Sequence, residues 1–423
     1  MESWEISVII ALLLYLWFRR RLWGWLDPLF LFLSLRIATA ITVVAQYLFN
    51  PDLAGPGLLH MTLCLAIFTT SLWLYSPKTR PAPPPLGKKT LQARHLLGIG
   101  LVVLVCKLFI LLSVYNELPI IMGETGSDSY IEFDMSNKVA SSLLLGFGSF
   151  DTVLLACCTP LLTSKKEKYL GWFGLLVSIA VTIATPKKAT ILNVVFAIAL
   201  GEYLRLYFFD RKARMFIKPV FMGIGGSMGL LWAYFVYSTT VANVDFDSVN
   251  DALNFVCSQF MYPYSLYASG DIYDFASFYN LNPLLYFFHS VSSLIDYPAF
   301  TASIGPSLHE YYGGSLSGHG INETFIIEGY IVFGRAMSLL YALFLGVLLG
   351  WARRIFLLPP HNVGKVALTA LLLPPMYVLP VSSLLAIKML IVCSLLIAGY
   401  VIVIGPLRSF MTVLGRSRED CLR

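Results

Sequence analysis

The sequence predicts an all-α, polytopic integral membrane protein with about eleven transmembrane helices. Of its 423 residues, 57% are hydrophobic and 13% are charged, which lies outside the composition of soluble globular domains. Long apolar stretches follow one another along the chain, and a helix needs about 20 such residues to cross a bilayer. Basic residues gather in alternate loops, which is the usual orientation signal of a membrane protein.

Eleven apolar stretches reach or approach the length of a membrane-spanning helix. They are residues 5–18, 26–49, 57–75, 96–115, 139–162, 169–185, 189–209, 219–241, 325–350, 366–386 and 388–407. The chain therefore divides into three parts. Residues 1–241 hold about eight spans, residues 242–324 form one large periplasmic loop, and residues 325–423 hold about three spans and a cytoplasmic tail.

The loops between these stretches differ in charge. Six basic segments hold 23 of the 30 Lys and Arg residues, and all six fall on one side when eleven spans are counted from an outer N-terminus. The positive-inside rule assigns that side to the cytoplasm. This orientation accounts for the net charge of +6, so we expect no nucleic-acid partner.

The long loop lies on the opposite side and is acidic, because the stretch Ala242–Asn322 contains no Lys or Arg. Loops of this length are usually functional or contain helices of their own. We expect short amphipathic helices in "DALNFVCSQFMYPYSLY" and "NPLLYFFHSVSSLI", lying at the membrane interface.

Seven basic residues remain outside the cytoplasmic segments: Arg36, Lys107, Lys138, Lys187, Lys188, Arg335 and Lys388. Lys138 is expected to extend from a helix end towards water. Lys107 and Asp151 both lie inside expected spans. They form either a buried structural ion pair or part of a functional site.

Lys187 and Lys188 lie in the short turn "TPKKAT" on the outer side, against the orientation rule. Two ammonium groups at the start of a helix add to the positive end of its dipole, which costs a few tenths to about 1 kcal/mol. An anionic ligand such as a phosphate would remove this cost. The alternative is a pair of hydrated surface lysines.

Arg335 lies about ten residues into the expected span 325–350, which is too deep for a flanking residue. An arginine inside the membrane needs a partner or a polar cavity, and Arg36 in "FLSLRIATAI" has the same requirement. Lys388 enters the last span from the outer side. Glu328, on the helix of Arg335, is an alternative partner for it in a plain ion pair.

Residues 180–352 resemble the Wzy-type O-antigen and polysaccharide repeat-unit polymerases of the bacterial inner membrane. The resemblance consists of a basic turn before an apolar helix, a long outer loop, "GINETFIIEGYIVFG", and "LFLGVLLG" before a basic turn. The family pattern around the loop exit matches Glu323, Phe325, Gly329, Gly346 and Gly350. The chain departs from that pattern at Asn322, Ile327 and Glu328, and in lacking loop arginines.

The resemblance implies a GT-C-like fold and a glycosyl transfer on the periplasmic side of the inner membrane. A glycan on undecaprenyl pyrophosphate is transferred to a hydroxyl of the next lipid-linked repeat unit. The implied partners are this lipid-linked oligosaccharide donor and acceptor, membrane lipids, and a chain-length regulator protein.

Such a transfer needs fixed cations beside the leaving pyrophosphate. The candidates are Lys187, Lys188, Arg335, Lys388 and Arg36. It also needs a base for the acceptor hydroxyl, which contributes roughly 10²–10⁴-fold to the rate. Glu323 and His319 are the candidates, with Glu323 favoured by the family pattern. The aromatic residues of "DIYDFASFYN" either stack on sugar faces or lie in the membrane interface.

We expect no metal ion and no other cofactor. The acidic triplets at 132–134 and 245–247 resemble the spaced carboxylates that hold a divalent cation in many sugar transferases, and they stay as the alternative. Two other functions stay open. One is an O-antigen ligase, which uses the same donor with a different acceptor, and the other is a flippase or transporter of an anionic lipid-linked sugar.

Overall fold

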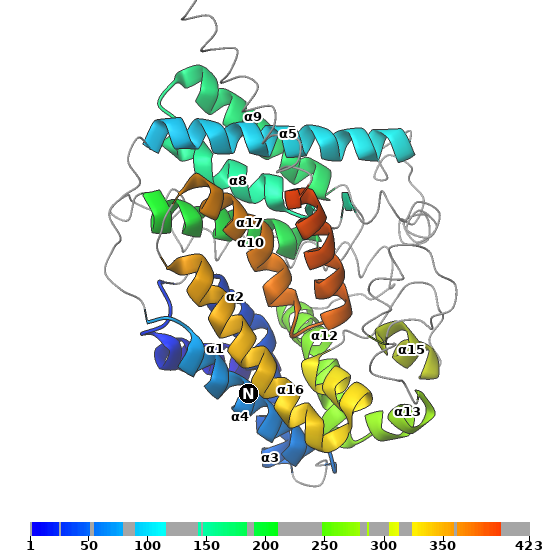
Figure 1. The fold of residues 1–423 in the computed structure, drawn as a ribbon. Coiled ribbons are helices and arrows are strands. Elements are labelled where there is room, and N and C mark those ends of the chain that lie inside the picture. The colour runs from blue at the N-terminus through cyan, green and yellow to red at the C-terminus, as the bar shows by residue number, and fades with distance from the viewer. Residues whose placement is uncertain are drawn as a thin grey trace, which may run out of the picture.

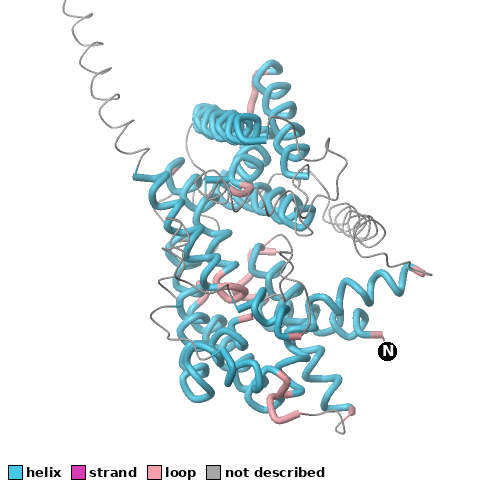
Figure 2. Tube along the Cα trace, turned by 90° about the vertical axis from the view of Figure 1, so that its right-hand side faces the viewer, coloured by secondary structure: helices cyan, strands magenta, loops and turns pink. Residues whose placement is uncertain are grey.

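The computed structural model describes residues 2–24, 27–50, 55–78, 89–115, 143–144, 147–183, 190–209, 248–279, 286, 304–312, 324–358 and 362–398. Figures 1 and 2 show helices joined by loops in these ranges, with no strand among them. The all-α prediction is therefore confirmed for the described part of the chain.

The first half of the chain contains α1 (Ser3–Phe18), α2 (Pro28–Phe32), η1 (Leu33–Ile37), α3 (Ala38–Phe49), α4 (Leu58–Tyr75), α5 (Lys89–Tyr115), α8 (Phe150–Cys158), η4 (Thr159–Leu161), α9 (Lys165–Ile183), α10 (Thr190–Leu204) and η5 (Arg205–Phe209). The second half contains α12 (Val249–Ser269), α13 (Ile272–Tyr279), α15 (Ile304–Tyr311), α16 (Phe325–Leu357), α17 (Val363–Val378) and an apolar helix over Ser383–Ala398.

Four helical stretches are long and apolar enough to cross a membrane: Pro28–Phe49, Leu58–Tyr75, Leu91–Ser113 and Phe325–Leu357. Shorter apolar helices accompany them at Ser3–Phe18, Phe150–Leu161, Val363–Val378 and Ser383–Ala398. These helices are those of a membrane protein. The expected span 219–241 lies outside the described residues, so the count of eleven spans stays a prediction.

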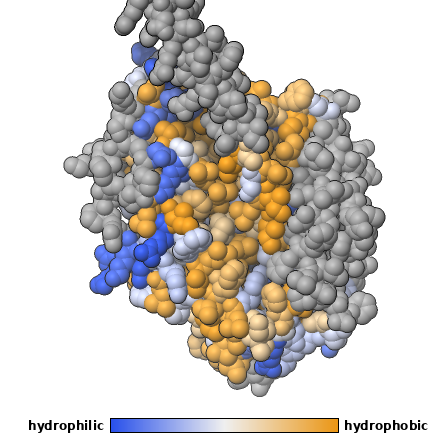
Figure 3. Space-filling model, viewed as in Figure 1, coloured by the Kyte–Doolittle hydropathy of each residue, from blue (hydrophilic) through white to orange (hydrophobic). Residues whose placement is uncertain are grey.

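Large apolar side chains cover the outside of the molecule as well as its core. Figure 3 shows a broad hydrophobic area on one face, with hydrophilic residues gathered along its left side. Phe109 on α5 is 70% exposed and Phe344 on α16 is 57% exposed. Exposed apolar area of this extent marks a surface that contacts lipid or another protein rather than water.

The helices form two groups that α17 joins (Figure 1). One group contains α1, α3, α4, α12 and α16, and the other contains α5, α8, α9 and α10. The closest pair is α4 with α16, where glycines allow the backbones to approach. A Cβ added at Gly346 would lie 2.6 Å from the carbonyl oxygen of Phe68, and one at Gly350 would lie 3.0 Å from the Ser76 nitrogen.

The expected single span 325–350 is a helical hairpin. Gly334 has φ 77° and ψ 175°, which breaks α16 into a short arm, Phe325–Phe333, and a long arm, Arg335–Leu357. A Cβ added at Gly329 would lie 3.5 Å from the Cα of Ser338, so the short arm folds back on the long one. The two arms are visible as the yellow and orange parts of α16 in Figure 1.

The long arm and α4 run in the same direction. His60 contacts Arg335 near the start of both helices, and Gly350 contacts Tyr75 near their ends. Basic residues follow each of these ends, so the positive-inside rule assigns the ends to the cytoplasm and the starts to the outer face. We call the His60 end of the molecule the outer end.

The short arm begins inside the helix bundle and runs towards the outer end. The ring of Phe325 stacks on Phe68 at 4.7 Å, and Phe68 lies about 15 Å along α4 from its start at Leu58. Such re-entrant segments are stable in a membrane where protein covers their polar ends. Here the Phe325 N–H donates to the Pro380 carbonyl at 2.9 Å, and Thr324 caps the Ile327 N–H.

The outer loop contains the first of its two expected helices. Residues of "DALNFVCSQFMYPYSLY" form most of α12, whose N-cap is Ser248 and whose C-cap is Gly270 at φ 95°. This helix packs against α1, α3 and α4 instead of lying alone at the interface. Of the second expected helix, "NPLLYFFHSVSSLI", the structure describes Tyr286.

Candidate functional site

A polar and aromatic cluster lies at the outer end, where α12, α13, α4 and the α16 hairpin meet. We call it the outer tyrosine cluster, and its members are His60, Tyr267, Tyr273, Tyr330, Arg335 and Ser338. His60 and Tyr267 are buried, whereas Arg335 is exposed and Tyr273 and Tyr330 are half-buried. The cluster therefore extends from the protein core to an accessible surface.

His60 joins three helices through its ring nitrogens. Its Nε2 lies 2.8 Å from the Arg335 carbonyl and 3.0 Å from the Ser338 hydroxyl, and its Nδ1 lies 2.5 Å from the Tyr267 hydroxyl. Because a carbonyl accepts hydrogen bonds and cannot donate them, Nε2 carries the proton and Nδ1 accepts from Tyr267. Burial raises the pKa of the Tyr267 hydroxyl, so this donor keeps its proton at physiological pH.

Three tyrosine rings pack together around this histidine. The rings of Tyr273 and Tyr330 are tilted by 36° with centroids 4.9 Å apart. Both meet Tyr267 edge-on, at interplanar angles of 86° for Tyr273 and 82° for Tyr330. Edge-to-face and offset contacts are the favourable geometries of aromatic pairs, so the three rings form a rigid wall.

Arg335 does not lie within one continuous helix over 325–350, which corrects that part of the expectation from sequence. The correction follows from the break at Gly334, because Arg335 is the first residue of the long arm. From Arg335 to Arg353 this arm rises about 27 Å, close to the apolar thickness of a bilayer. The Arg335 carbonyl lies 2.8 Å from Nε2 of His60, which places this residue beside the outer tyrosine cluster.

Arg36 lies in a π-helical turn, Leu33–Ile37, in the middle of the helix Pro28–Phe49. Turns of this kind inside α-helices are frequent at functional sites. The guanidinium lies 4.9 Å from the centroid of the Phe260 ring on α12, which is a cation–π distance. Phe260 and Tyr267 are two helical turns apart, so the contact of Arg36 lies about 10 Å along α12 from the tyrosine that is bonded to His60.

Glu328 on the short arm is fully buried and accepts several hydrogen bonds. Tyr286 and Tyr341 donate to it at 2.5 and 3.0 Å. The Ser383 hydroxyl and N–H also donate to it, which satisfies the start of the helix Ser383–Ala398. Lys388 is half-buried on that helix, just over one turn after Ser383.

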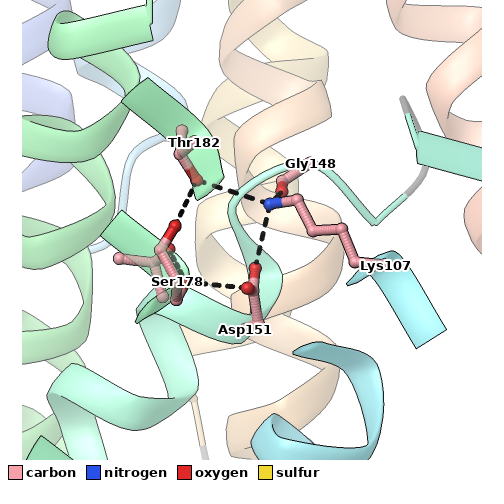
Figure 4. Close-up of polar contacts among 6 residues, drawn as sticks. Lys107, Gly148, Asp151, Ser178 and Thr182 are labelled. Carbon is pink, nitrogen blue, oxygen red and sulfur yellow. Dashed lines mark hydrogen bonds and ion pairs between the residues drawn. The ribbon is translucent and has the colours of Figure 1, made fainter. Parts of the chain in front are cut away.

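Lys107 and Asp151 form the buried pair that the sequence suggested, with Nζ and Oδ1 3.4 Å apart (Figure 4). The Lys107 ammonium also donates to the Gly148 carbonyl at 2.9 Å and to Thr182 at 3.4 Å. Ser178 donates to the second carboxylate oxygen of Asp151 at 2.7 Å. With three acceptors around its three N–H groups, Lys107 has the arrangement of a structural network that joins α5, α8 and α9.

Four of the predicted site residues lie outside the described residues. They are Lys187, Lys188, Glu323 and His319, and the acidic triplets 132–134 and 245–247 lie outside as well. Of the predicted site residues, the structure therefore describes Arg36, Arg335 and Lys388. Arg36 contacts Phe260 of α12, the Arg335 carbonyl contacts His60 of α4, and Lys388 belongs to the helix that Glu328 caps.

Sequence reasoning missed His60, Tyr267 and Tyr330. The partners of His60 lie 207 and 278 residues away along the chain, a separation that no local pattern reports. One signal was present, because a histidine inside an apolar span such as "LLHMTLCLAIF" is by itself a functional hypothesis.

The fold and the cluster define a helical membrane protein with a polar, partly aromatic site at one end of its helices. Comparison with known proteins adds no family to this description, because no family model, curated protein or solved structure matches the chain.

Proposed function

We propose that this protein is a membrane glycosyltransferase that polymerises lipid-linked oligosaccharide repeat units on the periplasmic side of a bacterial inner membrane. The donor is a glycan on undecaprenyl pyrophosphate, and the acceptor is a hydroxyl of the next lipid-linked unit. The proposal rests on the resemblance of residues 180–352 to Wzy-type polymerases and on the geometry of the outer end.

The observation that carries the proposal is the pair of arginines beside α12. Arg36 comes from one membrane helix and its guanidinium lies against Phe260 of α12, whereas Arg335 begins another helix and is linked to Tyr267 of α12 through its carbonyl and His60. One positive charge at the start of the long arm and a second one deeper in the bundle suit a ligand whose phosphate groups lie near that end of the helices and whose polyprenyl chain lies in lipid.

The chemistry gives these charges a role. The bond from the sugar C1 to the pyrophosphate oxygen breaks, and a new bond forms from C1 to the acceptor oxygen. The acceptor proton passes to a base, for which Glu323 and His319 are the candidates. Negative charge grows on the leaving pyrophosphate, so Arg36 and Arg335 would stabilise the transition state more than the ground state.

The first test measures elongation by purified protein in nanodiscs, supplied with lipid-linked repeat units. We expect products with several repeat units for the wild type. Arg335→Gln and Arg36→Gln should each lower the turnover rate about 10²–10³-fold, the usual loss on removing one charged or polar stabilising group. Mass spectrometry of the lipid-linked products measures both outcomes.

Arg94→Gln is the matched control for these variants. Arg94 is an exposed arginine that pairs with Glu167 at 2.8 Å on the basic side of the molecule, so its loss should leave elongation unchanged. Full activity of Arg335→Gln and Arg36→Gln would contradict the proposed role. Transfer only to a lipid A-core acceptor would identify a ligase instead.

Broken helices favour a second candidate, a transporter of an anionic lipid-linked sugar. The short arm of α16 meets the break between α17 and the helix Ser383–Ala398, through the bond from Phe325 to Pro380. Discontinuous helices that meet inside the bundle are typical of transporters. Movement of a fluorescent lipid-linked sugar across proteoliposomes, with its covalent structure unchanged, would support this candidate over the polymerase.

A further inference from the structure

We infer that Tyr273 and Tyr330 form a binding subsite for the sugar ring that is attached directly to the phosphate of the ligand. This inference rests on the proposed function and deepens it. It assigns the aromatic residues to the sugar and the guanidinium of Arg335 to the phosphate, so the recognised group is a glycosyl phosphate.

The hydroxyl of Tyr273 provides the first argument. This oxygen is buried and has no hydrogen-bond partner among the described residues, although Tyr273 belongs to a cluster in which Tyr267 and His60 are bonded to each other. A buried hydroxyl without a partner costs roughly 1–3 kcal/mol. A ligand hydroxyl group that completes this bond would remove the cost.

The accessibility of the rings provides the second argument. Tyr273 and Tyr330 are half-buried, so each retains exposed ring surface, whereas Tyr267 behind them is fully buried. Sugars bind aromatic rings through their apolar C–H faces and bind neighbouring polar groups through their hydroxyls. A pair of fixed rings with an unsatisfied hydroxyl beside them offers both types of contact.

The position of Arg335 provides the third argument and sets the ligand class. Arg335 follows Tyr330 across the break at Gly334, and its carbonyl lies 2.8 Å from Nε2 of His60 within the cluster, so its exposed side chain starts next to the aromatic wall. A ligand that contacts both Arg335 and the tyrosine rings must carry an anionic group next to an apolar ring face. A sugar linked at C1 to a phosphate has this arrangement, whereas a neutral free sugar lacks the anion.

A membrane-interface belt is the other explanation for these tyrosines, and their geometry disfavours it. Tyrosines in such belts direct the hydroxyl to water and the ring to lipid. Here the Tyr273 hydroxyl is buried and its ring packs on two other tyrosines. This geometry is that of tyrosines that line a binding site.

The test measures equilibrium binding to protein in nanodiscs with three probes: polyprenyl pyrophosphate carrying a repeat unit, polyprenyl pyrophosphate without sugar, and the free oligosaccharide. Tyr273→Phe and Tyr330→Ala should each weaken binding of the sugar-bearing lipid about five- to tenfold, the effect of one hydrogen bond or aromatic contact. Neither should change binding of the sugar-free lipid. Arg335→Gln should weaken binding of both lipids.

Two controls accompany these variants. Tyr169→Ala removes a tyrosine that is 73% exposed on α9, and it should leave both affinities unchanged. The melting temperature of Tyr273→Phe should equal or exceed that of the wild type, because the variant keeps the ring and deletes a polar atom that has no hydrogen-bond partner among the described residues. A large fall in melting temperature would instead identify a structural role and overturn the inference.

The remaining outcomes separate this inference from the proposed function. Equal losses for both lipids in the tyrosine variants, or no loss at all, would overturn the sugar subsite even if the protein elongates glycans. Selective loss for the sugar-bearing lipid without any elongation would support the subsite and contradict the polymerase. Failure of the wild type to bind either lipid would overturn both.

Discussion

Lys107 and Arg353 both carry a positive charge among apolar helices, and each is neutralised by one carboxylate. Arg353 is 1% exposed and donates to both oxygens of Asp27, at 2.8 and 3.0 Å, and to the Tyr377 hydroxyl at 2.7 Å. Asp27 also caps the start of α2 through the Leu29 N–H. Arg353, which the sequence assigns to a basic cytoplasmic turn, therefore also connects α16 to the start of α2 and to α17 inside the protein.

The Lys107–Asp151 pair leads to a prediction about stability. Lys107→Met should lower the free energy of unfolding by about 3–5 kcal/mol, because it leaves the carboxylate of Asp151 buried without its cation. Adding Asp151→Asn should recover most of this loss, since the amide can still accept from Ser178. Thermal unfolding in detergent measures both values.

Elongation assays on the same variants separate a structural role from a catalytic one. If the pair is structural, as its closed network indicates, the double variant regains activity together with stability. A stable double variant without activity would instead assign Lys107 or Asp151 to the reaction. The sequence identified both residues but left these two roles open, because the surrounding acceptors come from two other helices.

At the level of elements, the hairpin of α16 decides where the arginine of the site lies. Hydropathy predicts one span over 325–350, because both arms are apolar. The hydropathy pattern does not indicate that the chain reverses its direction within this segment. The reversal depends on one backbone conformation, at Gly334. It makes Arg335 the first residue of the long arm instead of an interior residue of one continuous helix.

Gly334→Ala tests this element. Its φ of 77° and ψ of 175° belong to a region that glycine alone adopts readily, so alanine should destabilise the protein by about 1–3 kcal/mol. Elongation should fall as well, because Arg335 is the next residue. Thermal unfolding and the elongation assay measure the two effects.

Gly98→Ala is the control for this variant. Gly98 lies within α5, has no heavy atom within 4 Å of an added Cβ, and should gain about 0.5–1 kcal/mol on substitution. Wild-type stability and activity of Gly334→Ala would mean that α16 crosses the membrane as an unbroken helix.

At the level of the whole molecule, two helix groups meet through α17, and the outer end carries the half-exposed part of the site. Hydropathy predicted the helical membrane character, and the lengths and composition of four helices confirm it. Charge asymmetry predicted the orientation. Hydropathy and charge asymmetry are sums over residues along the chain, so neither depends on contacts between distant segments.

Cysteine labelling tests the orientation of the molecule. In a background with Cys106→Ser, Cys257→Ser and Cys421→Ser, Asp274→Cys on α13 should react with a membrane-impermeant maleimide in intact spheroplasts. Lys166→Cys on α9 should react only after lysis, because the positive-inside rule assigns the basic start of α9 to the cytoplasm. Both residues are exposed in the structure, so burial does not limit the reaction. Labelling of Lys166→Cys from outside would reverse the orientation and move the outer tyrosine cluster to the cytoplasmic side.

The sequence by itself determined that this protein is helical, apolar on its surface and asymmetric in charge, and it selected Arg36 and Arg335, with Lys187, Lys188 and Lys388, as exceptional cations. These features follow from composition and local periodicity. Only the tertiary structure decided that Arg335 begins the long arm of a hairpin and that His60 joins Tyr267 to it. Such contacts connect segments 207 or more residues apart, and they form because buried polar groups must find partners wherever the packing of helices brings them.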